Sequence, residues 1–63
     1  MKEILDIKQL STYLQVSIPL IRKLVRQKDI PYFRVGNRLK FDLVKINLWI
    51  EEKEEKNKKI FLF

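Results

Sequence analysis

Two helix-start signals lie close together near the beginning of the chain, and their spacing constrains the fold more than any other feature. Asp6 is followed three residues later by Gln9, which is the pattern of a capping box. The first helix has an apolar stripe that ends at Leu14, and Ser17, a second N-cap residue, follows only three positions later. We therefore predict one helix over residues 7–14 and another from about Ile18, joined by a tight turn.

The second of these helices has two faces of different character. Ile21, Leu24 and Val25 form an apolar stripe at helical spacing. The opposite side is polar and basic, with Arg22, Lys23, Arg26 and Gln27. A short helix, a tight turn and a second helix with a basic outer face is the arrangement that lets a recognition helix enter the major groove of DNA. The pattern predicts a helix-turn-helix.

The positive charge is concentrated in one stretch of the chain. The formal net charge is +6, and residues 22–40 hold seven basic side chains and one acidic side chain, so the whole excess lies there. The segment from residue 51 onward has four Glu and four Lys and adds no net charge. Charge gathered in this way is expected of a surface that binds a polyanion. A solvated basic face is the alternative interpretation.

The rest of the composition limits the classes of protein. With 63 residues the chain has room for one domain with a small core. It contains no Cys and no His, so we expect no disulfide, no metal or cofactor site and no enzymatic activity. No run of about 18 apolar residues occurs, and the start of the chain lacks the apolar stretch of a signal peptide. We expect a cytoplasmic protein that does not enter a membrane.

A β-hairpin is predicted after the second helix. Ile30-Pro31 interrupts the helical pattern, because the residue before a proline is pushed out of the helical region. Apolar and basic residues then alternate on both sides of Gly36-Asn37, as in two short strands. An isolated hairpin is marginal in water, so we expect this one to pack on the helices as a wing.

The register of the hairpin is predicted from the side on which each residue points. A two-residue loop would place Arg38 and Lys40 opposite apolar residues. A three-residue loop gathers four apolar side chains on one face: Phe33, Val35, Leu39 and Phe41. We therefore predict the three-residue loop, with Arg34 and Lys40 on the solvent face and Arg38 at the tip.

A third helix is predicted from Leu43 to about Asn57, with Asp42 as its N-cap. Its inner face has four apolar residues at helical spacing: Leu43, Ile46, Trp49 and Ile50. We expect Trp49 to be the largest single piece of core. Residues 1–57 then form one domain, and residues 58–63 form a short apolar tail.

Two apolar features remain at the end of the chain. Val44 and Leu48 form a second stripe on the third helix, and the last residues are Ile60-Phe61-Leu62-Phe63. Burying a large apolar side chain is worth roughly 1.5 to 3 kcal/mol. We predict that both features form an association surface, for self-assembly or for a partner such as a recombinase. A disordered tail and a tail folded back on the helix are the alternatives.

The order of these elements resembles that of the excisionase-type helix-turn-helix domains, small relatives of the MerR-type winged helix. The resemblance covers roughly residues 5–50 and is carried by Leu5-Asp6-Ile7, Tyr13-Leu14, Val16-Ser17, Ile21, Leu24, Ile30-Pro31, Phe33-Arg34-Val35-Gly36, Arg38, Phe41, Ile46 and Trp49-Ile50. It implies a mostly α fold with a small β-hairpin, a winged helix-turn-helix of order α-α-β-β-α. It also implies sequence-specific DNA binding in a mobile element, either as an excisionase that bends DNA for an integrase or as a small transcription regulator.

The chain departs from the family pattern in two ways. The family commonly has Gly at the positions of Gln15 and Lys28. The start of its recognition helix is usually polar, whereas this chain has Ile18-Pro19-Leu20. Ile18 and Leu20 either border the core or contact thymine methyl groups. In both cases more of the sequence specificity would move to Arg22, Lys23 and DNA shape.

Two functional hypotheses follow. The first is a module that binds double-stranded DNA, with the second helix in the major groove and the wing on the backbone or in the minor groove. The predicted major-groove residues are Arg22, Lys23 and Arg26, and the predicted backbone contacts are Ser17, Arg34, Arg38 and Lys40, of which Arg38 could instead enter the minor groove. The alternative is a protein-interaction module that uses Val44, Leu48 and the apolar tail.

Overall fold

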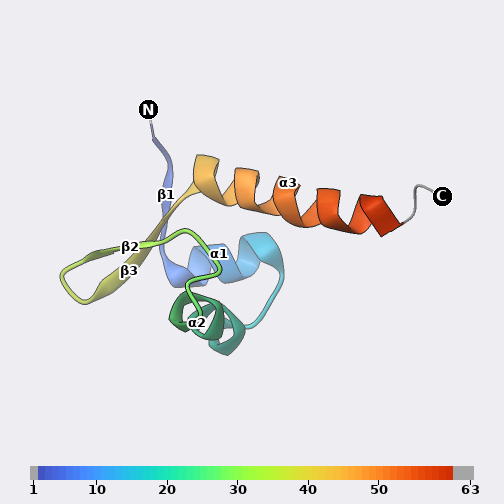
Figure 1. The fold of residues 1–63 in the computed structure, drawn as a ribbon. Coiled ribbons are helices and arrows are strands. Elements are labelled where there is room, and N and C mark those ends of the chain that lie inside the picture. The colour runs from blue at the N-terminus through green and yellow to red at the C-terminus, as the bar shows by residue number, and fades with distance from the viewer. Residues whose placement is uncertain (1, 61–63) are drawn as a thin grey trace.

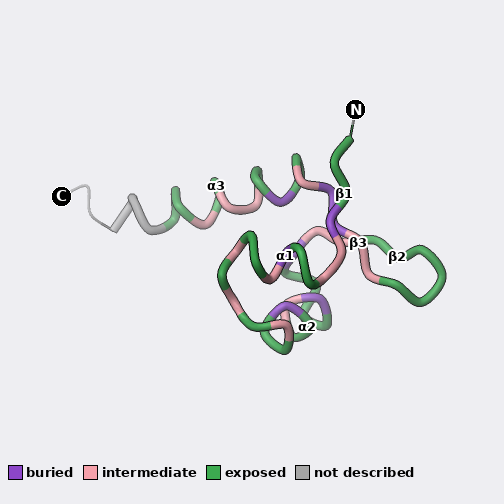
Figure 2. The backbone as a smooth tube through the Cα atoms, turned by 180° about the vertical axis from the view of Figure 1, so that it is seen from behind, coloured by how far each residue is buried: buried purple, intermediate pink, exposed green. Residues whose placement is uncertain are grey.

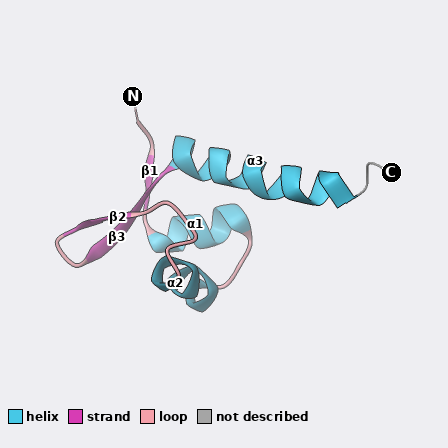
Figure 3. Ribbon diagram, viewed as in Figure 1, coloured by secondary structure: helices cyan, strands magenta, loops and turns pink. Residues whose placement is uncertain are grey.

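The computed structural model describes the backbone of residues 2–60 and the side chains of residues 2–56. The elements are β1 (Ile4–Leu5), α1 (Ile7–Leu14), α2 (Ile18–Arg26), β2 (Phe33–Val35), β3 (Arg38–Asp42) and α3 (Leu43–Ile60). The helices α1 and α2 lie below α3, and the β2–β3 hairpin projects to one side (Figure 1; Figure 3). The predicted winged helix-turn-helix order α-α-β-β-α is confirmed.

The turn between α1 and α2 is fixed by hydrogen bonds at both helix ends. The predicted capping box at Asp6 is present, since its carboxylate accepts from the Gln9 N–H at 2.7 Å. At the other end of α1, the Ser11 hydroxyl donates to the Val16 carbonyl at 2.6 Å, and the Ser11 carbonyl accepts from the Val16 N–H at 3.2 Å. The Ser17 hydroxyl then accepts from a backbone N–H of α2 at 3.3 Å, as an N-cap. These bonds orient α2 relative to α1.

The end of α2 has the geometry of a Schellman motif. The Lys28 N–H donates to the Val25 carbonyl, and the Asp29 N–H donates to the Leu24 carbonyl, both at 3.0 Å. Lys28 has a left-handed backbone with φ of 54°, although it is not a glycine. The chain then leaves the helix and buries Ile30.

The sheet contains a strand that the sequence did not indicate. Residues 4 and 5 form β1, which pairs with β3, so the strand order is β1-β3-β2. Ile4 lies opposite Asp42, and Leu5 lies opposite Phe41. A strand of two residues is too short to give a periodic pattern in the sequence.

The predicted register of the hairpin is wrong. Phe33 lies opposite Lys40 and Val35 lies opposite Arg38, so the loop has two residues. Its first residue, Gly36, has φ of 62°, which is the backbone that the first central position of a type II′ turn requires. The outer part of the wing projects past the helices and stays exposed (Figure 2), so no buried face imposes the other register.

This register also separates two basic residues that were expected on one face. Arg34 lies opposite Leu39, whereas Lys40 lies opposite Phe33. Since neighbouring residues of a strand point to opposite sides, Arg34 and Lys40 are on different faces of the wing.

The core lies where α1, α2, β3 and the start of α3 meet. Its buried apolar residues are Leu5, Leu10, Ile21, Val25, Ile30, Phe41 and Ile46. Among the described side chains Phe41 is the largest that is fully buried, so the expectation that Trp49 would be the largest piece of core is wrong. Trp49 is half-buried at the edge, where its indole N–H reaches the backbone carbonyl of Asp29 at 2.6 Å.

The helix α3 starts as predicted, with the Asp42 carboxylate accepting from the Val44 N–H at 3.0 Å. Burial of Asp42 raises the pKa of its carboxyl, but the Val44 N–H and the ammonium of Lys2, 3.4 Å away, outweigh burial and hold this pKa below its ordinary value. The helix extends to Ile60, past the predicted end at Asn57.

The second apolar stripe of α3 is exposed to solvent. The side chains of Val44 and Leu48 are 62% and 58% exposed. The predicted tail, residues 58–63, lies outside the residues whose side chains the structure describes.

Within the described part of the chain, no helix is long and apolar enough to cross a membrane.

Candidate nucleic-acid interface

A basic groove lies between α2, the wing and the start of α1. Its volume is about 450 Å³. Arg22 and Arg26 line it from α2 and Arg34 lines it from β2. Its other charged lining residues are Arg38 and Lys40 of β3, and Asp6 and Lys8 at the start of α1. The groove therefore combines six basic residues with one carboxylate, and that carboxylate already caps α1.

The structure brings together five of the predicted contact residues in this groove: Arg22, Arg26, Arg34, Arg38 and Lys40. Lys23 is exposed on α2 but does not line the groove. Ser17 is exposed at the start of α2, where its hydroxyl is the N-cap. Lys23 thus lies on the same helix as Arg22 and Arg26, and Ser17 precedes the first residue of that helix.

Lys8 is a groove residue that the sequence analysis missed. It follows the Asp6 cap on the exposed side of α1 and has no basic neighbour in the sequence. A lone lysine gives no charge-cluster signal. Its place in the groove follows only from the packing of α1 beside α2 and the wing.

The groove cations are not neutralised by acidic side chains of the described chain. Among residues 2–56, the ion pairs join Lys2 to Asp42 and Lys53 to Asp29, and neither involves a groove residue. An anion entering the groove would therefore not have to displace an internal carboxylate from these cations, and unpaired arginines bind phosphate well.

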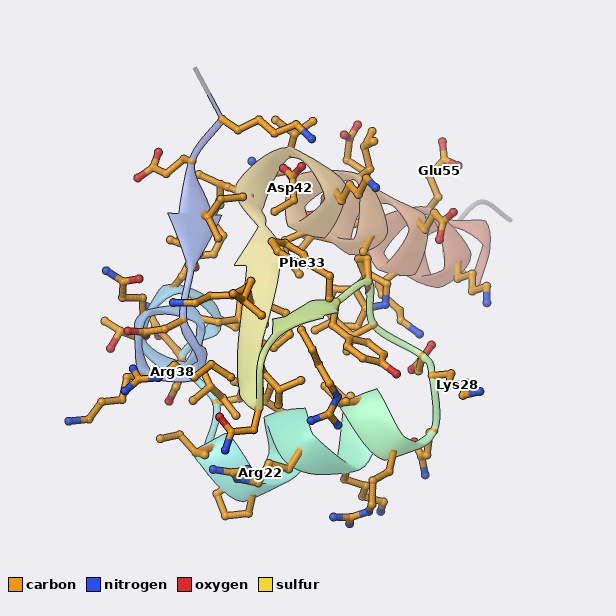
Figure 4. All side chains as sticks on the ribbon, turned by 90° about the vertical axis from the view of Figure 1, so that its left-hand side faces the viewer. Arg22, Lys28, Phe33, Arg38, Asp42 and Glu55 are labelled. Atoms are coloured by element: carbon orange, nitrogen blue, oxygen red, sulfur yellow. The ribbon has the colours of Figure 1, made fainter. Side chains whose placement is uncertain are left out.

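Charge is distributed unequally between two sides of the molecule. Arg22 of α2 and Arg38 of the wing lie on the same side, whereas Glu55 of α3 lies away from them (Figure 4). Glu55 belongs to an exposed stretch of α3 in which four glutamates are interspersed with lysines, so that stretch does not share the positive charge of the groove. A polyanion is therefore attracted to the groove side more strongly than to this part of α3.

Burial separates the two apolar residues at the start of α2. Ile18 is half-buried, whereas Leu20 is exposed next to the N-cap. Leu20 is thus accessible to a ligand of α2, while Ile18 lies closer to the core edge.

The fold and the groove together define a winged helix-turn-helix domain with a basic face. The model of the helix-turn-helix domain family matches residues 4–54, and the chain belongs to that family. The match covers α1, α2, the wing and the first part of α3, and it supports a DNA-binding domain. Neither a curated protein nor a solved structure matches the chain significantly.

Proposed function

We propose that the protein binds double-stranded DNA in a sequence-specific manner, with α2 in the major groove and the wing on the flanking backbone or in the minor groove. The observation that carries this proposal is the groove between α2 and the wing, which arginines line from both walls. A phosphodiester strand between these walls would meet cations from each side.

The two walls have different roles in this proposal. Arg22, Lys23 and Arg26 on α2 reach base edges, where arginine can bind guanine O6 and N7 in a bidentate manner. The hydroxyl of Ser17 contacts a phosphate. The basic residues of the wing, which are Arg34, Arg38 and Lys40, also contact phosphates. Arg38, next to the wing turn, is the residue that can enter the minor groove.

The biological role that we propose is that of a small protein of a mobile element. It acts either as an excisionase that bends attachment-site DNA for an integrase or as a transcription regulator. The resemblance to excisionase-type domains of the MerR-like superfamily and the shared element order support this role. An integrase gene beside this one would favour the first, and a reconstituted excision reaction with that integrase tests it.

A second candidate function is protein association through α3. The observation that favours it is the exposure of Val44 and Leu48 on the side of the helix that does not pack on the core. We propose that this stripe, with Ile60 to Phe63, pairs copies of the protein or binds a recombinase. A protein-interaction module without DNA binding is the alternative use of the same scaffold.

A comparison of two arginine variants tests the proposed contacts. Arg38→Ala should weaken binding to all duplexes alike if Arg38 meets phosphate. Arg22→Ala should also reduce the preference for the target over random duplex, because a base contact is worth roughly 1 to 3 kcal/mol of discrimination. Equal loss of discrimination in both variants would contradict this division of roles.

A further inference from the structure

The connection between α2 and the wing is fastened to α3 at Asp29. The indole N–H of Trp49 donates to the Asp29 backbone carbonyl at 2.6 Å. The ammonium of Lys53 lies 3.2 Å from each carboxylate oxygen of Asp29. The same ammonium lies 5.4 Å from the centre of the Trp49 ring, within range of a cation–π contact. We call Asp29, Trp49 and Lys53 the latch.

The latch acts on the residue through which the two walls of the groove are joined. The N–H of Asp29 completes the C-terminal motif of α2 by bonding to the Leu24 carbonyl at 3.0 Å. Its carbonyl and carboxylate bond to α3. The chain then continues through the buried Ile30 into β2. Asp29 thus links α2, α3 and the start of the wing, on the connection that carries Lys28 (Figure 4).

The ion pair of the latch is a surface interaction. The side chains of Lys53 and Asp29 are 43% and 41% exposed. Exposed pairs of this kind contribute little to the free energy of unfolding. Asp29 is also the only acidic residue between positions 22 and 40, so its charge opposes the attraction of a polyanion to that stretch.

We infer that Asp29, Trp49 and Lys53 are positioning residues that hold α2 and the wing at the spacing that a DNA strand requires. This inference rests on the proposed DNA binding. Trp49 and Lys53 do not contact the DNA themselves. They act on DNA binding through the connection between α2 and the wing. A looser connection widens the groove and weakens binding while the core stays folded.

Asp29→Asn tests the inference through the sign of its effect. The substitution removes a negative charge from the basic stretch, so electrostatics alone predicts tighter binding of DNA. The substitution keeps the backbone carbonyl that Trp49 contacts but removes the ion pair with Lys53, and loss of this part of the latch predicts weaker binding, by about two- to fivefold for an exposed ion pair. The matched control is Glu55→Gln, which removes the same charge on the side of α3 opposite to Lys53. The control should bind duplex DNA at least as tightly as the wild type.

Trp49→Phe removes the indole donor and keeps an aromatic ring in place. We expect about a three- to tenfold loss of affinity, which is the range of one hydrogen bond.

A double variant tests whether Asp29 and Lys53 act through one contact. Asp29→Asn with Lys53→Gln leaves the net charge unchanged. Its loss of DNA affinity should be smaller than the product of the losses of the two single variants, because both substitutions break the same contact.

A distance measurement in the free protein tests the latch separately from DNA binding. The chain contains no Cys, so spin labels at Lys23→Cys and Asn37→Cys report the distance between α2 and the wing. The distance distribution should broaden when Trp49→Phe is added. If the wild type binds no duplex while this broadening occurs, the proposed function fails and the latch stands. An unchanged distribution, or tighter binding by Asp29→Asn equal to that of the control, overturns the latch.

Discussion

Phe33 and Phe41 lie on opposite faces of the sheet, because Phe33 pairs with Lys40 and Phe41 is the next residue along β3. Phe41 points into the core and is fully buried, whereas Phe33 remains 41% exposed. The alternation of apolar residues in the sequence predicted both phenylalanines on one face. Because they lie on opposite faces, they contribute differently to stability.

Substitution of these two residues should separate their roles. Phe41→Ala is expected to cost about 3 to 5 kcal/mol, as a large-to-small change in the core, and to unfold much of a domain this small. Phe33→Ala should cost about 1 to 2 kcal/mol, because Phe33 is 41% exposed and loses only part of the buried area of a core phenylalanine. Urea denaturation measures both free energies of unfolding. Equal costs would contradict the two-residue loop.

Glycine at either left-handed position should stabilise the protein. Gln15 and Lys28 have φ of 57° and 54°, a backbone that costs a residue with a Cβ roughly 1 to 2 kcal/mol. We expect Gln15→Gly and Lys28→Gly each to raise the free energy of unfolding by about 1 kcal/mol, although part of the gain is offset by the greater flexibility of the unfolded chain. Thermal unfolding with Gln15→Ala as the control, which keeps the strain, checks this. A lower melting temperature for both glycine variants would count against it.

The helical part of the fold could be predicted from the sequence because its signals are local. The capping box at Asp6, the N-cap at Ser17 and the cap of Asp42 on α3 each depend on residues a few positions apart. The charge cluster likewise identified most of the groove. The left-handed backbone at Gln15 and Lys28 is also a local feature, of the kind that glycine adopts most easily.

The parts that could not be predicted depend on the arrangement of distant segments. The register failed because parity assumes a buried face, and the outer wing has none. The strand β1 and the groove position of Lys8 arise only when the start of the chain meets β3 and α2. Trp49 lies at the edge because its N–H bonds to Asp29, a partner 20 positions away that periodicity does not indicate.

The cap of α3 should make stability depend on pH in the acid range. The pKa of Asp42 is lower in the folded protein than the ordinary value of 3.8, so the folded state favours the charged carboxylate. This contribution is fully present above that ordinary value and is lost as the pH falls through the lowered pKa. Melting temperatures between about pH 2 and pH 6 should therefore fall more steeply for the wild type than for Asp42→Asn. Parallel curves would show that Asp42 does not contribute.

The exposed stripe on α3 should affect association but not binding of a single copy to DNA. Val44→Ser with Leu48→Ser removes exposed apolar area, so we expect the single-site affinity to stay within about twofold, since neither residue touches the groove. Cooperativity on a longer duplex, or recruitment of a recombinase, should decrease. Titration of a short duplex measures the single-site affinity, and titration of a long duplex measures the cooperativity. If only the single-site affinity falls, the stripe is part of the DNA-binding surface.

The dependence of affinity on salt tests the central claim most directly. Each phosphate contact releases condensed counterions, which lowers log K by about 0.9 per unit of log salt. If the four groove cations that are not assigned to base edges, Lys8, Arg34, Arg38 and Lys40, each meet a phosphate, the slope for duplex DNA should be roughly −3 to −4. Arg38→Ala should make the slope less steep by about 1. A slope near zero for the wild type would contradict DNA binding by this groove.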